Sequence, residues 1–114
     1  MNIIVMYIIR IMLNNNENKI SLYKIQLLFN YCRCRLINDY MIDDVINAKM
    51  LDIMVALQDT DLFIVTGVGD PSGNIYLEFR NKIDDATIAS FEDKLTLLDK
   101  QILDDLISKT NTTI

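Results

Sequence analysis

The sequence predicts a mainly α-helical domain that carries one β-hairpin, which places it in the α+β class. Apolar residues recur at three- and four-residue spacing over 22–37 and again from residue 88 onward, as expected for helices that bury one face. All three glycines and the only proline lie within residues 62–80, between two runs of alternating apolar residues. A chain of 114 residues forms one core without disulfides. We therefore expect a single domain over residues 1–109 and a frayed tail over 110–114.

The net charge of −5 is distributed unevenly along the chain. Residues 1–38 carry five basic residues and one acidic residue, a balance of +4, whereas residues 39–114 carry six basic and fifteen acidic residues, a balance of −9. A basic first third is consistent with a surface for phosphate groups. The alternative is that these dispersed charges are simply the solvated faces of helices.

The stretch from Ile3 to Leu13 is apolar on nearly all sides, which favours a helix buried between others over the alternative of a central strand. This run contains Arg10 and is well short of the roughly 20 residues that span a bilayer. It also lacks the basic leader and small-residue cleavage site of a signal peptide. These features predict a cytoplasmic protein without a membrane partner.

Two further helices are expected before the hairpin. Ser21 is a suitable N-cap for a helix that runs to about Ile37, with residues 38–40 as a connection. The next helix is predicted to begin near Asp43 or Asp44, whose carboxylates suit the positive end of a helix dipole, and to end near Leu57. Its predicted inward stripe is Val45, Ile46, Met50, Ile53, Met54 and Leu57.

The hairpin turn is expected to centre on Pro71, with residues 69–73 at its tip. This register places Phe63 opposite Phe79, Val65 opposite Leu77 and Gly67 opposite Ile75. An isolated two-stranded hairpin is marginally stable in water, so its apolar face should pack on the helices.

A single long helix is predicted over about 86–108, capped by Asp84 or Asp85. At 1.5 Å per residue it would be about 33 Å long, which is more than a small three-helix core needs. We therefore expect part of its apolar stripe to pair with a second copy of the chain in a homodimer. The candidate dimerisation residues are Ile88, Phe91, Leu95, Leu98 and Ile102.

The residue content argues against catalysis. The chain has no histidine, which removes Ser-His and Cys-His nucleophile pairs and the usual acid–base group of neutral pH. Cys32 and Cys34 would point about 200° apart on a helix, so they do not form a metal ligand pair. The glycines of residues 67–73 lack the Lys-Ser/Thr ending of a phosphate-binding loop. We expect a protein that is not an enzyme and that uses neither a metal nor a cofactor.

Three helices, a hairpin and a last long helix form an order of elements that resembles winged-helix domains. The resemblance covers about Ile3 to Arg80, with 22–37 and 43–57 as the helix-turn-helix pair and the hairpin as the wing. The last helix is similar to the dimerisation helix of many small prokaryotic and viral members. The resemblance implies that the third helix enters the major groove of DNA and that the wing touches its backbone or minor groove.

Two functions are consistent with this resemblance. The first is a small dimeric DNA-binding protein, either a transcriptional regulator or a plasmid or phage partition adaptor. The second is a non-catalytic interaction subunit that holds a partner protein through the acidic third helix, where Asp43 and Asp52 lie, or through the apolar last helix. The candidate DNA-binding residues are Lys24, Arg33, Arg35, Asn47, Lys49, Arg80 and Lys82.

Overall fold

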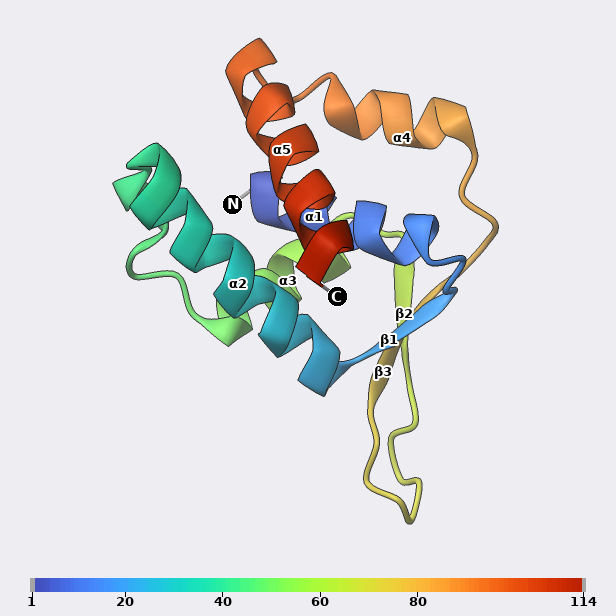
Figure 1. The fold of residues 1–114 in the computed structure, drawn as a ribbon. Helices are drawn as coiled ribbons and strands as arrows, with labels where there is room; N and C mark the ends of the chain where they lie inside the picture. The colour runs from blue at the N-terminus through green and yellow to red at the C-terminus, as the bar shows by residue number, and fades with distance from the viewer. Residues whose placement is uncertain (1, 114) are drawn as a thin grey trace.

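The computed structural model describes residues 2–113, and side chains over residues 2–110. This part of the chain is mainly helical with a small antiparallel sheet, so the predicted α+β class is confirmed (Figure 1). Its elements in chain order are α1 (Asn2–Asn14), β1 (Lys19–Ser21), α2 (Leu22–Tyr40), the 3-10 turn η1 (Asp43–Val45), α3 (Met50–Asp59), β2 (Phe63–Thr66), β3 (Tyr76–Phe79), α4 (Asp85–Glu92) and α5 (Leu97–Thr113).

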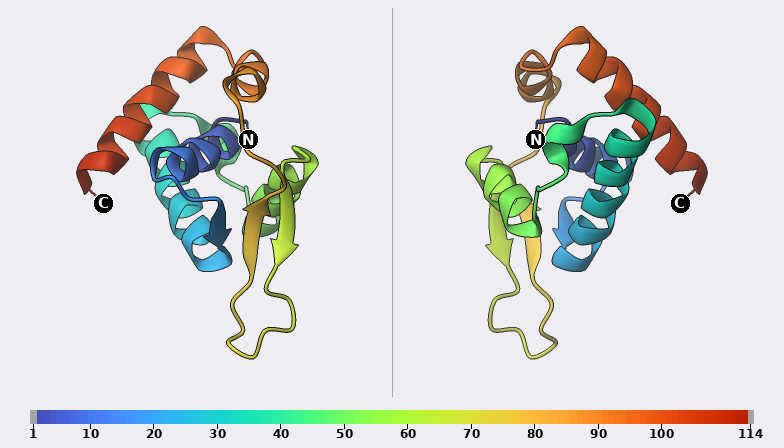
Figure 2. Two further views of the ribbon diagram at one scale, coloured as in Figure 1. Left: turned by 90° about the vertical axis from the view of Figure 1, so that its right-hand side faces the viewer. Right: turned by 90° about the vertical axis from the view of Figure 1, so that its left-hand side faces the viewer.

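Helix α1 is the centre of the core, and the helix predicted for Ile3 to Leu13 is confirmed. Figure 2 shows α1 between α5 on one side and the α3–hairpin unit on the other. Met6, Tyr7 and Met12 are each at most 2% exposed although they project in three different directions around the helix. An apolar surface on all sides is therefore matched by neighbours on all sides.

Strand β1 was not predicted, and it makes the sheet three-stranded in the order β1-β3-β2. It pairs with β3 so that Ile20 lies opposite Leu77, and both side chains are buried. Three residues are too few to show an alternating pattern in a sequence. The strand exists because β3 offers it hydrogen-bonding partners, among them the Phe79 N–H that donates to the Asn18 carbonyl at 2.8 Å.

Helix α2 begins as predicted but ends later. The Ser21 Oγ accepts a hydrogen bond from the Lys24 N–H at 3.1 Å, which confirms Ser21 as the N-cap. The connection predicted for residues 38–40 is wrong, because the helix continues to Tyr40 and ends at Met41 with φ 55°. The Tyr40 hydroxyl hydrogen-bonds to Asp105 of α5, so a tertiary contact holds the last turn of α2 in place.

The third helix is shorter than predicted. Residues 43–45 form only the turn η1, and α3 begins at Met50, so neither Asp43 nor Asp44 lies at the N-terminus of α3. Asp52 takes that role, since its Oδ2 accepts the Lys49 N–H at 2.8 Å. Val45 is buried from the turn and Ile46 is half exposed, so the predicted inward stripe combined two separate elements.

The predicted hairpin register is confirmed from Phe63 opposite Phe79 to Val65 opposite Leu77. The predicted Gly67–Ile75 pair is wrong, because the strands end at Thr66 and Tyr76. Gly67 has φ +83°, outside the strand region, and a Cβ there would lie 2.2 Å from the Asn74 carbonyl oxygen. Beyond this point the hairpin projects away from the helices (Figure 1).

The predicted long last helix is two helices, α4 and α5, joined by a turn over residues 93–96. Asp84 caps α4 by accepting the Thr87 N–H at 2.8 Å, as one of the two predicted caps. The two helices run in different directions (Figure 2), because the buried Leu95 lies within the turn between them. In the structure α5 continues to Thr113, into the segment predicted to fray, and Thr110 is 2% exposed. Residue 114 lies outside the described residues.

Candidate functional site

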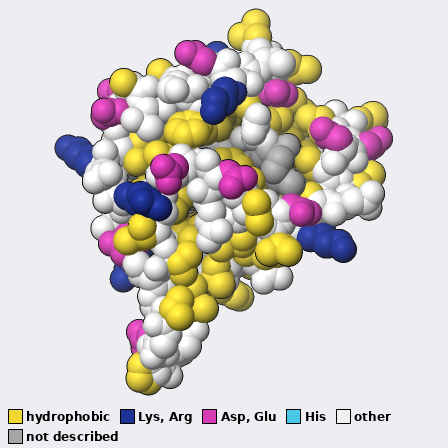
Figure 3. Space-filling model, turned by 180° about the vertical axis from the view of Figure 1, so that it is seen from behind, with side chains coloured by type: hydrophobic (Ala, Val, Ile, Leu, Met, Phe, Trp, Pro, Cys, Tyr) yellow, Lys and Arg dark blue, Asp and Glu magenta, His cyan; other side chains and the backbone are white. Residues whose placement is uncertain are grey.

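Exposed hydrophobic side chains gather on α3 and on the hairpin. On α3 these are Leu51 and Val55, which are 73% and 48% exposed. On the hairpin they are Ile64, Val65 and Val68. Figure 3 shows hydrophobic side chains continuing down the back of the molecule onto the hairpin. Uncovered apolar area of this kind marks interaction sites on soluble proteins.

The helical period explains why α3 presents two apolar faces. Ile53 and Leu57 point into the core, while Leu51 and Val55, spaced by four residues, share the opposite face. We name this outer side of the helix the α3 face. It consists of Leu51, Val55 and Gln58, flanked by the exposed carboxylates of Asp52 and Asp59.

No lysine or arginine belongs to α3 itself. Lys49 immediately precedes the helix and is exposed, and Asn47 lies exposed in the same connection. Both were predicted to stand on the third helix, and both lie before it because that helix begins at Met50. The α3 face is therefore apolar at its centre and acidic at its borders, with one cation at the start of the helix.

Four of the predicted DNA-binding cations are held by groups of the chain itself. The Arg33 Nη1 donates to the Ala48 carbonyl at 2.9 Å. Arg35 pairs with Asp39 at 2.9 Å, and this hydrogen bond raises the pKa of the guanidinium. Lys24 lies 3.4 Å from Glu17. Arg80 reaches Asp61 at 3.5 Å and the Phe63 carbonyl at 3.2 Å.

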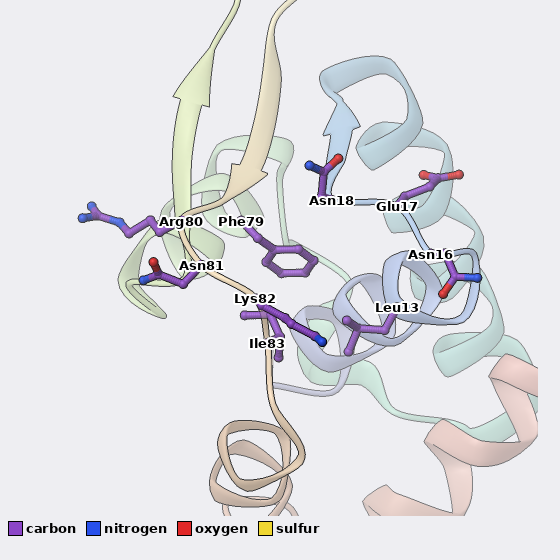
Figure 4. A pocket seen from close by; sticks show the side chains of 9 residues that line it. All are labelled: Leu13, Asn16, Glu17, Asn18, Phe79, Arg80, Asn81, Lys82 and Ile83. Carbon is purple, nitrogen blue, oxygen red and sulfur yellow. The ribbon is translucent and has the colours of Figure 1, made fainter.

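The seven predicted DNA-binding residues do not come together in one patch. Arg33 and Arg35 leave α2 in nearly opposite directions, since residues two apart on a helix diverge. Arg80 and Lys82 follow β3, and their side chains point in different directions (Figure 4). Figure 3 shows the Lys and Arg side chains of the rear face as separate spots with Asp and Glu between them.

A groove of about 510 Å³ lies between the carboxyl end of α1 and the segment after β3 (Figure 4). The Phe79 ring forms its centre with Lys82 and Ile83 beside it, while Arg80 and Asn81 point away. The groove offers apolar surface, the ammonium group of Lys82, the carboxylate of Glu17 and the amides of asparagine side chains. Its lining contains no cysteine or serine that a neighbouring base could activate. The full lining is Leu13, Asn16, Glu17, Asn18, Phe79, Arg80, Asn81, Lys82 and Ile83.

The predicted dimerisation residues do not form one outward stripe. Leu95 and Ile102 are buried in the core of the chain itself. Ile88 and Phe91 of α4 pack partly against that core, and only Leu98 is mostly exposed. The turn between α4 and α5 separates residues that a continuous helix would have aligned.

Two buried titratable groups have pKa values well above their ordinary range. Burial raises the pKa of the Cys32 thiol to about 12, so this cysteine stays protonated and inert at neutral pH. Burial also raises the pKa of Tyr7 to about 12, against the opposing effect of its hydrogen bond to Thr110. Among the residues that the structure describes, no three Cys, Asp or Glu side chains are placed to hold a metal ion.

Among residues 2–113, none of the helices combines the length and the apolar character needed to cross a membrane. Comparisons of the chain with family models, with curated proteins and with solved structures each found no match.

The sequence indicated the third helix as a partner-binding element because of its acidic residues, but it did not identify Leu51 and Val55 as the centre of the α3 face. The sequence nevertheless contained an indication of this apolar face, because Leu51 and Val55 fall outside the predicted inward stripe of the third helix. Hydrophobic residues on both sides of a short helix predict either burial on both sides or one uncovered apolar face. Only the structure distinguishes these two cases, because it leaves Leu51 and Val55 exposed.

Proposed function

We propose that this chain is a non-catalytic protein-interaction subunit with a winged-helix-like fold, which binds a partner protein through the α3 face. The order of three helices followed by a projecting hairpin supports the winged-helix comparison. In that comparison α3 takes the place of the helix that reads DNA. Fold alone does not establish function, so the support for a protein partner comes from the chemistry of this face.

The observation that carries the proposal is the composition of the α3 face. A helix that reads bases offers arginine, lysine or amide side chains and lies close to phosphates. Here the centre is Leu51 and Val55, and the flanking groups are the carboxylates of Asp52 and Asp59. Carboxylates would be repelled by a phosphate backbone, whereas exposed apolar side chains gain free energy when a protein partner covers them.

The test is affinity capture from the organism that encodes the chain, with three baits compared. The baits are the unchanged protein, the double variant Leu51→Asp/Val55→Asp, and the control variant Leu97→Asp. Leu97 is 74% exposed at the start of α5, so it matches Leu51 in exposure but not in position. We expect one partner that the unchanged protein and the control retain and the double variant loses. If all three baits retain the same proteins, the α3 face is not the binding surface.

DNA binding, as a dimeric regulator or partition adaptor, is the second candidate. It is favoured by the exposure of Asn47 and Lys49 in the connection that leads into α3, and by a hairpin that projects away from the helices (Figure 1). Selection of genomic fragments, followed by anisotropy titration at several salt concentrations, tests it. A discrete site whose affinity falls steeply with salt and with Lys49→Ala, but not with the control Lys100→Ala, would replace the first proposal. No enrichment over random fragments at low salt would remove this candidate.

A further inference from the structure

Within the described part of the chain, strand β2 has a neighbouring strand on one side only, because the sheet order is β1-β3-β2. We propose that two copies of this chain pair through the free edge of β2 and join their sheets into one continuous antiparallel sheet. This inference concerns the backbone edge of β2 and does not depend on the partner proposed for the α3 face.

The hydrogen-bonding pattern of the hairpin shows which groups face that edge. The Arg80 N–H donates to the Leu62 carbonyl at 2.8 Å, so Leu62 and Arg80 form a hydrogen-bonded pair. Such pairs alternate along an antiparallel ladder, so Ile64 and Thr66 also face β3. Phe63 and Val65 therefore direct their N–H and C=O groups outward.

The outward edge is only partly protected. The Arg80 Nε donates to the Phe63 carbonyl at 3.2 Å, which leaves one lone pair of that oxygen free. Natural edge strands are usually blocked by charged side chains, proline or bulges. Residues 62–69 contain no charged residue and no proline, and β2 pairs with β3 without a bulge. Ile64 and Val65 are each 43% exposed, one on each face of the strand.

A second copy fits this edge because the strand is complementary to itself. With the two-fold axis at Ile64, Phe63 of each copy exchanges both backbone hydrogen bonds with Val65 of the other. Each Val65 then lies beside a phenylalanine on one face, and the two Ile64 side chains meet on the other. An axis at Val65 would instead pair Phe63 with Gly67, whose φ of +83° is outside the strand region. No like charges oppose each other in the first arrangement.

Sedimentation velocity over a wide range of protein concentration tests the pairing. We expect a dimer for the unchanged protein and a monomer for Val65→Pro, since proline removes the N–H that the ladder directs away from β3. Val65→Lys is a second blocking variant that keeps the backbone N–H. The control is Val68→Lys, which places the same charge at a residue 74% exposed beyond the strand and should remain dimeric. Circular dichroism melts establish that each variant is folded.

Cross-linking tests the register. Ile64→Cys in a Cys34→Ser background should form a disulfide-linked dimer under mild oxidation, because residues facing each other across a non-hydrogen-bonded position are close enough for the bond. Tyr23→Cys in the same background is the control, since Tyr23 is 72% exposed on α2. The proposal is overturned by a monomeric unchanged protein, by a folded Val65→Lys variant that stays dimeric, or by cross-linking at residue 64 no greater than at residue 23.

Discussion

The hydrogen bond between Tyr7 and Thr110 connects the first and last helices of the described chain inside the core. The Tyr7 hydroxyl lies 2.6 Å from the Thr110 Oγ1, which also donates to the Leu106 carbonyl at 2.8 Å. Tyr7 is fully buried and its ring stacks on Tyr31 with centroids 6.4 Å apart. Replacing Thr110 by valine keeps the size of the side chain and removes its hydroxyl.

The expected loss of stability in Thr110→Val follows from the hydrogen bond that it removes and from the buried hydroxyl that then lacks this partner. One buried hydrogen bond is lost, and the Tyr7 hydroxyl stays buried without that partner, for a total of about 2 kcal/mol. Tyr7→Phe instead removes the tyrosine hydroxyl itself, and Thr110 keeps its hydrogen bond to the Leu106 carbonyl. The free energy of unfolding of this variant should therefore fall by about 1 kcal/mol. The double variant should lose less than the sum, with a coupling of about 1 kcal/mol.

Equilibrium unfolding in urea measures these differences, with Ser108→Ala as the control because Ser108 is exposed on the same helix. Its free energy of unfolding should stay within about 0.5 kcal/mol of the unchanged protein. If Thr110→Val behaves like Ser108→Ala, the end of α5 does not dock on α1. The sequence-based expectation of a frayed tail would then be correct.

Three further predictions concern the hairpin, the core thiol and a helix cap. Gly67→Ala should destabilise the protein by more than Gly69→Ala. The φ angle is similarly positive at both residues, but only a Cβ at Gly67 meets the Asn74 carbonyl. Thermal melts of the two variants measure the difference. In the folded protein the pKa of Cys32 is raised from 9.0 to about 12. Because the unfolded chain loses this proton at a lower pH than the folded protein, the free energy of unfolding should fall as the pH rises from about 9 towards 12. Urea titrations at several pH values should show a shallower decline for Cys32→Ala. Ser21→Ala should cost about 1 kcal/mol in the same assay, since it removes the cap of α2.

Elements whose stability is encoded locally were predictable from the sequence. The hairpin register followed from the alternation of Phe63 and Val65 against Leu77 and Phe79. The start of α2 followed from the cap at Ser21. In both cases the residues that specify the element lie within it or next to it.

The errors arose where distant contacts decide the local structure. Strand β1 is formed through β3, which lies more than fifty positions later, and the last turn of α2 is held by Asp105. The turn between α4 and α5 interrupts a periodic pattern because Leu95 is buried at that point. Periodicity shows which residues are apolar but not where the chain bends to bury them.

For the candidate site, the sequence showed which residue types the third helix contains but not which of them lie together on an exposed surface. The sequence indicated an acidic third helix, and Asp52 is indeed on α3, but Asp43 belongs to the turn η1. The intramolecular partners of Arg33, Arg35 and Arg80 come from other segments of the chain. A count of charged residues does not show whether a cation is available to bind a ligand, because this depends on which groups the fold places beside it.

The central position of α1 has a consequence for synthesis of the protein in the cell. Tyr7 and Thr110 are 103 positions apart, so α1 leaves the ribosome long before α5 can cover it. Contacts of such long sequence separation form late and slow folding. During that interval the nascent chain exposes a helix that is apolar on nearly every side. Chaperones bind this kind of surface, and chains that expose it without a chaperone aggregate. Expression yield should therefore depend on chaperone supply more strongly than the size of the chain suggests.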